Sequence, residues 1–137
     1  LAVECRTDLL TERPAAAAAL AALDHEPTRL AVVAERTLLA ALEAGCSAPV
    51  GAIGHVTDEA VTLDAVAVRP DGGEQLRANA TVRLAGAFDA ATRLVDAQAA
   101  GATVATHLLQ AGAGALVARS DASAAREGSR WGPGVSQ

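Results

Sequence analysis

Cysteine is the residue type in this chain best suited to covalent chemistry, and the 137-residue sequence contains two, Cys5 and Cys46. A thiol is the best carbon nucleophile among protein side chains, and the thioether that it forms is stable to water. Cys46 lies in the segment 45–49, Gly-Cys-Ser-Ala-Pro, between a predicted helix and a predicted strand. We therefore take Cys46 as the candidate functional residue of the chain.

A free cysteine is commonly an inert, small hydrophobic residue, so position alone does not make Cys46 reactive. Cys46 follows a predicted helix C-terminus, whose partial negative charge disfavours the thiolate. The chain also has no Cys-x-x-Cys pair. These features argue against a peroxidase or a disulfide-exchange enzyme. A cysteine alkylated once by a very reactive electrophile needs less activation.

The helix that precedes Cys46 is predicted from apolar residues spaced four apart, which fall on one helical stripe. These residues are Leu30, Ala34, Leu38 and Leu42. Pro27 is predicted at the first helical position, and a domain boundary is placed near Glu26. Gly45 is predicted to be the left-handed residue that ends the helix, and Pro49 prevents the helix from resuming. Cys46 is thus expected at a defined corner.

Three strands are predicted after this corner, at residues 49–56, 60–68 and 75–84. The third alternates strictly between apolar and polar residues, so one face of the sheet is expected to be exposed to solvent. Short polar turns at residues 57–59 and 70–73 join the strands, which predicts an antiparallel meander. The fold class is therefore α/β (α+β), with a three-stranded antiparallel sheet covered on one face by helices.

A final helix is predicted over residues 89–110, with glycines at 112 and 114 ending it. Gly101 inside this helix is interpreted as a point of close packing against the sheet. Before the sheet, residues 1–5 are predicted as a strand and residues 14–23 as a helix. We interpret residues 1–25 as the terminal strand and helix of a missing N-terminal domain, residues 26–118 as one C-terminal domain, and residues 119–137 as a flexible tail.

Composition excludes several classes of function. The formal net charge is −5 and the arginines are dispersed, which argues against nucleic-acid binding. The longest apolar run, residues 15–23, is too short to span a membrane. Two distant cysteines without a secretory signal predict free thiols and a cytoplasmic location. Neither His25 nor the lone Trp131 is expected to have a catalytic or binding role, and no metal site is expected. The core is expected to consist of Ala, Val, Leu and the single Ile.

The segment around Cys46 resembles the cofactor-attachment motif of porphobilinogen deaminase (hydroxymethylbilane synthase). That motif reads Glu-Arg, spaced apolar residues, then Gly-Gly-Cys-x-x-Pro, an apolar residue and Gly or Ala. The sequence departs from it at Ala44 and Ala48, which are small replacements. Residues 1–6, 23–25, 70–72 and 101–112 are also similar to the family. The residues that fit the motif are Glu35, Arg36, Leu38, Leu42, Gly45, Cys46, Pro49, Val50 and Gly51.

The resemblance implies that Cys46 carries dipyrromethane through a thioether. In the family, a transferase of tetrapyrrole (porphyrin) biosynthesis, four porphobilinogen molecules are added to this cofactor, with release of ammonia, to make hydroxymethylbilane. The substrate-binding arginines and the catalytic aspartate belong to domains missing here, so the chain is expected to contain no catalytic residue and to be inactive alone. Porphobilinogen, the growing polypyrrole chain and the missing N-terminal domains are the implied partners of an otherwise monomeric enzyme.

A second hypothesis remains open. The chain could be a stand-alone, non-catalytic α/β interaction domain derived from the same family. The motif around Cys46 favours the first hypothesis, whereas the missing arginine cluster is compatible with the second.

Overall fold

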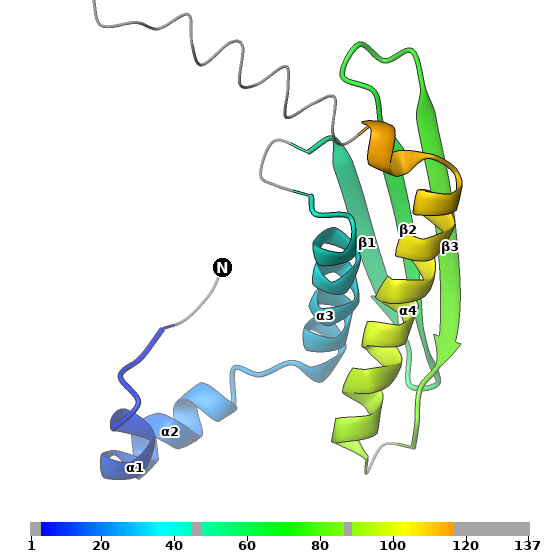
Figure 1. The fold of residues 1–137 in the computed structure, drawn as a ribbon. Coiled ribbons are helices and arrows are strands. Elements are labelled where there is room, and N and C mark those ends of the chain that lie inside the picture. The colour runs from blue at the N-terminus through cyan, green and yellow to red at the C-terminus, as the bar shows by residue number, and fades with distance from the viewer. Residues whose placement is uncertain (1–3, 45–47, 87–88, 117–137) are drawn as a thin grey trace, which may run out of the picture.

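A computed structural model describes residues 4–44, 48–86 and 89–116 of the chain (Figure 1). Four helices and three strands are defined in these residues. In chain order they are α1 (Leu9–Glu12), α2 (Pro14–Ala21), α3 (Glu26–Ala41), β1 (Val50–Val56), β2 (Ala60–Val68), β3 (Gln75–Arg83) and α4 (Ala90–Gln110).

The three strands form one antiparallel sheet in the order β1-β2-β3. This confirms the predicted meander, and the strands differ from the predicted ranges by at most one residue at an end. The ladders have no bulge: Val50 pairs with Ala67 and Val56 with Val61, while Ala60 pairs with Arg83 and Val68 with Gln75. The sheet is therefore continuous along its whole length.

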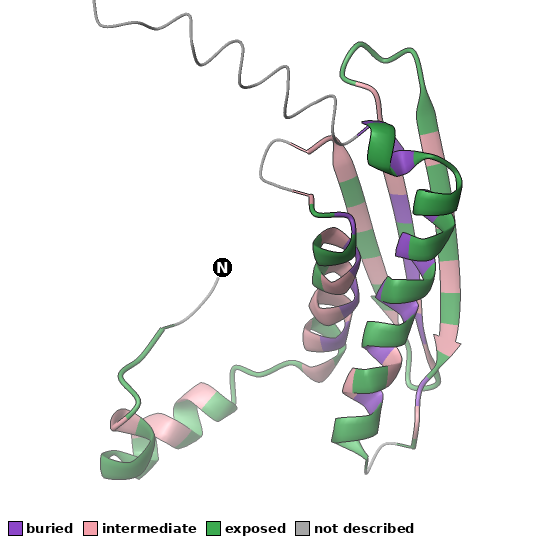
Figure 2. Ribbon diagram, viewed as in Figure 1, coloured by how far each residue is buried: buried purple, intermediate pink, exposed green. Residues whose placement is uncertain are grey.

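Helices α3 and α4 lie side by side on one face of the sheet and leave the other face open (Figure 1). The fold class predicted from the sequence is thus confirmed. Purple residues in Figure 2 line the space between these two layers. The fully buried larger side chains are Leu30, Leu38, Leu63, Leu108, Val61 and Val104.

The single isoleucine is an exception to the expected core. Ile53 is 55% exposed on the open face of β1, so its assignment to the core was wrong. β1 alternates between half-buried and exposed residues, and odd-numbered positions such as Gly51 and Ile53 point away from the helices. The core of the described residues therefore consists almost entirely of alanine, valine and leucine side chains.

Gly101 marks the closest approach between α3 and α4. A Cβ atom built on Gly101 would lie 2.8 Å from the Cβ of Thr37 and 3.1 Å from the backbone nitrogen of Leu38, and it would also collide with the carbonyl oxygen of Ala34. The predicted close packing is confirmed, but its partner is α3 rather than the sheet. A glycine at this position lets the two helix backbones come together.

Helix α3 ends earlier than the sequence indicated. Its C-cap is Leu42, and Glu43 is the residue with the left-handed conformation, at φ 51°. The N–H of Glu43 donates to the carbonyl of Ala40, and the N–H of Ala44 donates to that of Leu39. This pair of bonds is a Schellman motif, which satisfies the last carbonyls of the helix. Gly45, predicted to end the helix, lies outside the described residues.

The start of α3 lies close to its predicted position. The helix begins at Glu26, with His25 as N-cap, so Pro27 occupies the second helical position rather than the first. Nδ1 of His25 lies 2.8 Å from the hydroxyl of Thr28. His25 is therefore engaged in a local hydrogen bond at a helix start.

Helix α4 agrees with the prediction at both ends. Asp89 is its N-cap and accepts a 3.0 Å hydrogen bond from the N–H of Thr92. After the last turn, Gly112 has φ 101°, a conformation that favours glycine. Leu116 then returns to the core with 4% exposure. The predicted tail, residues 119–137, lies outside the described residues.

The N-terminal segment differs from the rest. α2 confirms the predicted helix, and α1 precedes it without having been predicted. Glu4 and Cys5 form no strand, so the predicted strand is wrong there, and Leu1 to Val3 lie outside the described residues. A strand needs a partner to bond its main chain, and none of the three described strands pairs with this segment. α1 and α2 contact each other but make no substantial contact with the sheet or its helices.

Candidate cofactor-attachment site

Cys46 belongs to the connection between α3 and β1, and residues 45–47 lie outside the described part of the chain. The structure therefore describes the two sides of the connection. On the helix side, Ala44 is half-buried against the core and bonded to Leu39. On the strand side, the carbonyl of Pro49 accepts a 2.9 Å bond from the N–H of Val68, which adds Pro49 to the ladder. Both sides of the candidate site are thus anchored.

A contact between α3 and β1 fixes these two elements relative to each other. Oε1 of Glu35 accepts a 2.8 Å hydrogen bond from the main-chain N–H of Gly54. Gly54 also packs directly on the helix, because a Cβ built on it would lie 2.9 Å from Cα and Cβ of Ala31. From the sequence, Glu35 was identified only as a residue that fits the motif. Its contact with a strand nineteen residues further on had no signal in the sequence.

Arg93 holds the opposite end of the domain and was not predicted from the sequence. Its side chain is 5% exposed, and Nε donates a 3.2 Å bond to Glu26. Nη1 donates to the carbonyl oxygens of Asp58 and Ala85, at 3.2 and 3.0 Å. One guanidinium therefore joins the start of α3, the β1–β2 turn and the segment after β3. Arg93 lies near the start of α4, and the sequence there gave no indication that its side chain would be buried.

The described residues contain little that could bind a polyanionic pyrrole chain. Arg6, Arg29, Arg69 and Arg93 each pair with a carboxylate. Arg36, which fits the family motif, is exposed on α3. No group of three or more His, Cys, Asp or Glu side chains in the described part of the chain could hold a metal ion. Cys5 is a free, exposed thiol.

Two surface carboxylates have a lowered pKa. The pKa of Asp71 is lowered, chiefly because its side chain accepts a 2.6 Å hydrogen bond from Arg69, and the same pair raises the pKa of Arg69. The pKa of Asp89 is lowered because its side chain accepts hydrogen bonds from the hydroxyl and the N–H of Thr92. Both carboxylates stabilise a turn or a helix start. Neither of them is a candidate for proton transfer.

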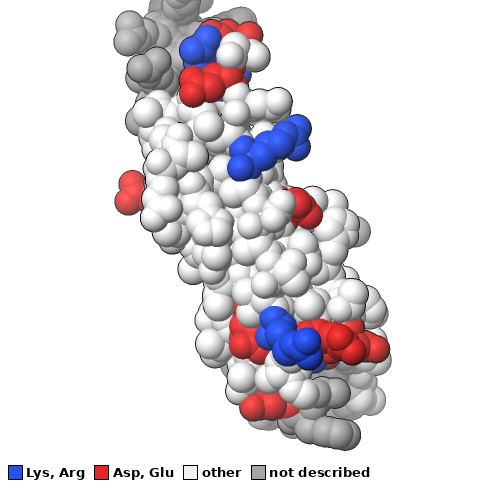
Figure 3. Space-filling view, turned by 90° about the vertical axis from the view of Figure 1, so that its right-hand side faces the viewer, with Lys and Arg blue, Asp and Glu red and all other residues white. Residues whose placement is uncertain are grey.

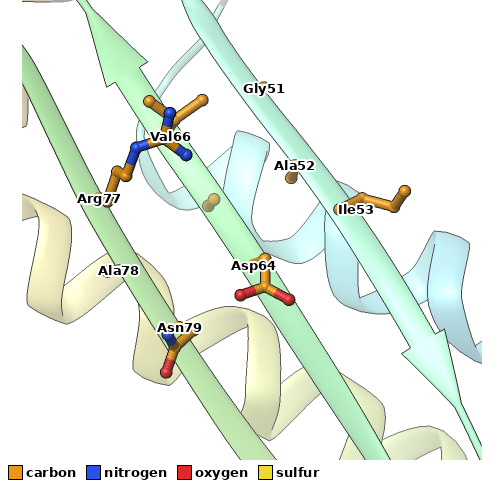
Figure 4. Close-up of a pocket in the computed structure, with 9 residues that line it drawn as sticks. Gly51, Ala52, Ile53, Asp64, Val66, Arg77, Ala78 and Asn79 are labelled. Carbon is orange, nitrogen blue, oxygen red and sulfur yellow. The ribbon is translucent and has the colours of Figure 1, made fainter.

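The open face of the sheet carries a shallow hollow of about 340 Å³ (Figure 4). Gly51 and Val66 are register partners there, and the missing side chain of Gly51 leaves space beside Ile53. Asp64 and Arg77 also line the hollow, from β2 and β3. With one acidic and one basic side chain, it does not provide the clustered positive charge that several carboxylates require.

No helix in the described segments combines the length and the apolar character needed to cross a membrane.

The fold and the candidate site define a class: a small α+β domain whose three-stranded sheet carries two helices on one face and whose first helix-to-strand connection contains a cysteine. The chain matches the family described as "Porphobilinogen deaminase, C-terminal domain" over residues 29–110. This range includes α3 from Arg29 onward, the Cys46 connection, the sheet and α4. The chain belongs to this family.

Relatives named porphobilinogen deaminase are similar over most of the chain. The protein of Acidothermus cellulolyticus is 46% identical over 117 residues, which is 85% of this chain and 32% of the relative. The protein of Thermobifida fusca is 44% identical over 127 residues, 92% of this chain and 37% of the relative. That of Mycobacteroides abscessus is 46% identical, covering 87% and 37%. The chain thus spans about a third of the length of these relatives.

Proposed function

We propose that the chain is the cofactor-bearing, C-terminal portion of a hydroxymethylbilane synthase and that Cys46 carries its dipyrromethane through a thioether. The main support is the family match, which runs through the Cys46 connection on both sides. The described geometry is compatible with this role, because α3 and β1 are joined through Glu35 and Gly54. A cysteine between two such elements is well suited to anchor a group repeatedly presented to an active site.

In this proposal, the remaining two thirds of the parent protein supply the catalytic carboxylate and the arginines that bind acetate and propionate groups. Four porphobilinogen molecules are then added to the cofactor, each with release of ammonia. Residues 1–25 belong to the preceding domain, residues 26–118 form the cofactor-bearing domain, and residues 119–137 form the tail. The parent is a cytoplasmic transferase, and the chain alone is inactive.

The chemistry at Cys46 is an alkylation. Porphobilinogen loses ammonia to leave an electrophilic methylene carbon, and the sulfur of Cys46 forms a bond to that carbon while its proton leaves. The resulting thioether is stable to water, so the anchor is used once and kept. Cys5 precedes α1, lies outside the motif and is not expected to react.

The experiment is reconstitution with the missing N-terminal part of the parent protein and porphobilinogen, followed by peptide mass spectrometry. Cys46 should gain the mass of a dipyrromethane, and the modified peptide should react with an aldehyde reagent for pyrroles. Cys46→Ser should abolish the adduct, and Cys5→Ser is the matched control that should retain it. An adduct on Cys5 would show that the assignment of Cys46 as the anchor is wrong. No adduct on either thiol, in an assembly that binds porphobilinogen, would favour the alternative of a non-catalytic interaction domain.

A further inference from the structure

Asp71 is the only aspartate or asparagine in the sequence that is followed by glycine. Such a pair is open to a spontaneous reaction, in which the main-chain nitrogen of the glycine attacks the side-chain carboxyl carbon of the aspartate. A following residue with a Cβ atom hinders this attack, whereas glycine leaves the nitrogen accessible and its backbone free to turn. Asp71 and Gly72 are thus the pair of this chain most open to this chemistry.

The pair lies in the turn between β2 and β3. The N–H of Arg69 donates to the carbonyl of Glu74, and the N–H of Gly72 donates to the carbonyl of Arg69, both at 2.8 Å. Gly72 has φ 75°, a conformation that favours glycine. Figure 3 shows charged side chains of both signs gathered at the upper end of the molecule, where the β2–β3 turn lies in Figure 1. The side chain of Asp71 is 64% exposed, so water reaches it freely.

Arg69 restrains both reacting groups of this pair. Its carbonyl holds the N–H of Gly72, so the attacking nitrogen has to leave the turn before it can react. Its guanidinium donates to Oδ1 of Asp71 at 2.6 Å, and the same oxygen accepts a 2.9 Å bond from the N–H of Gly73. The hydrogen bond from Arg69 is also the main cause of the lowered pKa of Asp71. An ionised carboxylate is a poor electrophile, because it has no hydroxyl group to expel as water.

Gly73 makes room for the guanidinium of Arg69. A Cβ atom built on Gly73 would collide with Nη2 of Arg69 and would lie 3.0 Å from its Cζ. Gly73 does not have the positive φ of Gly72, so its backbone can accept a side chain. A methyl group at this position would therefore displace the guanidinium from the turn and leave the backbone in place.

From the exposed Asp-Gly pair and the contacts that restrain it, we propose that Asp71 is the site at which this chain is modified by isomerisation to isoaspartate, and that Arg69 slows this modification in the folded chain. The nitrogen of Gly72 forms a bond to Cγ of Asp71, and its proton leaves with the expelled hydroxyl as water. The product is a cyclic succinimide. Hydrolysis takes up a water at either carbonyl of this ring and gives aspartate or isoaspartate. The reaction needs no other reactant.

The modification would alter the end of the sheet that adjoins the Cys46 connection. Isoaspartate adds a carbon atom to the main chain, so the turn that closes between Arg69 and Glu74 would no longer fit its hydrogen bonds. Val68, the last residue of β2, donates its N–H to the carbonyl of Pro49 at 2.9 Å. Isomerisation would therefore loosen this strand end. The class of partner that would recognise the modified chain is a methyltransferase specific for isoaspartate.

The test is incubation of the full chain near neutral pH and at physiological temperature, once folded and once in guanidinium chloride. Isoaspartate is measured by chromatography of the peptides and by methyl transfer from S-adenosylmethionine with an isoaspartate methyltransferase. The peptide that contains Asp71 should gain isoaspartate, faster in the unfolded chain than in the folded one. Asp64 is exposed and followed by alanine, so its peptide is the internal control and should stay unchanged. Asp71→Ala should abolish the signal of the turn peptide.

Two variants test the role of Arg69 and leave the reacting pair intact. Arg69→Gln removes the guanidinium but keeps the carbonyl bond, and Gly73→Ala displaces the guanidinium but keeps its charge. Each should raise the rate in the folded chain by about twofold to fivefold, the range that an exposed ion pair provides. Neither should change the rate in guanidinium chloride, where the high salt concentration screens the ion pair. Far-ultraviolet dichroism checks that each variant is folded.

Two results would overturn the site itself: isoaspartate that forms first at another residue, or equal rates in the folded and the unfolded chain. A rate in the folded chain that neither Arg69→Gln nor Gly73→Ala raises would overturn the role of Arg69.

Discussion

The carboxylate of Glu35 on α3 accepts a 2.8 Å hydrogen bond from the main-chain N–H of Gly54 on β1. This bond joins the helix before Cys46 to the strand after it, and it occupies a donor at the sheet edge. Glu35→Ala should lower the free energy of unfolding by about 1 to 2 kcal/mol, because a hydrogen bond to a charged acceptor is lost. Urea denaturation measures the change. Glu35→Gln keeps an acceptor oxygen and should lose less; equal losses in both variants would contradict this account.

Gly101→Ala should destabilise the domain although alanine is the better helix former. The new methyl would overlap the backbone of α3 near Ala34 and Leu38, which cannot move independently. Overpacking of this kind costs about 1 to 3 kcal/mol, whereas the gain in helix propensity is about 1 kcal/mol. We expect a lower urea midpoint. Ala102→Gly on the exposed side of α4 is the control for propensity alone, and a stabilised Gly101→Ala protein would show that α3 and α4 can separate without cost.

Arg93→Met should be among the most damaging single changes. It leaves the carbonyls of Asp58 and Ala85 without their guanidinium donor and Glu26 without its counter-charge. Loss of one partner from a buried charged network costs about 3 kcal/mol. Glu26→Gln should cost clearly less, because Glu26 is 35% exposed and the carbonyl bonds of Arg93 remain. Comparable losses in the two variants would mean that the ion pair, rather than the carbonyl contacts, dominates.

Glu43→Gly should stabilise the chain. Glu43 has φ 51°, a left-handed conformation that costs a residue with a side chain about 1 to 2 kcal/mol, while glycine gives back part of that gain as backbone entropy. The net gain should be up to about 1 kcal/mol, seen as a higher urea midpoint. Glu43→Ala keeps the left-handed strain and should show no such gain. A stabilisation of the same size in Glu43→Ala would attribute the effect to charge instead.

Asp89 should contribute to the acid sensitivity of the fold. Its pKa in the folded chain lies below the ordinary value of 3.8, so its stabilising effect is complete above that value and is lost as the pH falls through the folded pKa. Unfolding free energy should therefore fall as the pH drops below about 4, and it should fall less steeply in Asp89→Asn. The amide retains an acceptor for the N–H of Thr92. An unchanged slope in the variant would exclude Asp89 as a source of the pH dependence.

Regular alternation and helical spacing were enough to predict the sheet, its order and α4. These signals are local, and the apolar faces that they define are buried when the helices pack on one face of the sheet. Other features depend on which helix lies over which strand, so no local sequence pattern could predict them. These features are the packing partner of Gly101, the burial of Arg93 and the exposure of Ile53. The end of α3 was misplaced because glycine is the usual left-handed residue, whereas here glutamate adopts that conformation two positions earlier.

The candidate site, like the fold, could be predicted in part from local sequence patterns. The spacing of Glu35, Cys46 and Pro49 was sufficient to indicate the family, which the match over residues 29–110 confirms. The hydrogen bond between Glu35 and Gly54 required the structure, because it joins residues that approach only after the helix packs on the sheet. Attachment at Cys46 remains a proposal for mass spectrometry to test.

The aliphatic core has a practical consequence for every unfolding experiment above. Trp131 and Phe88 are the aromatic residues of the chain, and both lie outside the described residues, so the described core contains no chromophore. Intrinsic fluorescence and near-ultraviolet dichroism therefore have no reporter side chain among the described core residues of α3, α4 and the sheet. Loss of structure has to be followed through the peptide groups themselves, by far-ultraviolet dichroism or amide exchange, or through the heat that unfolding absorbs.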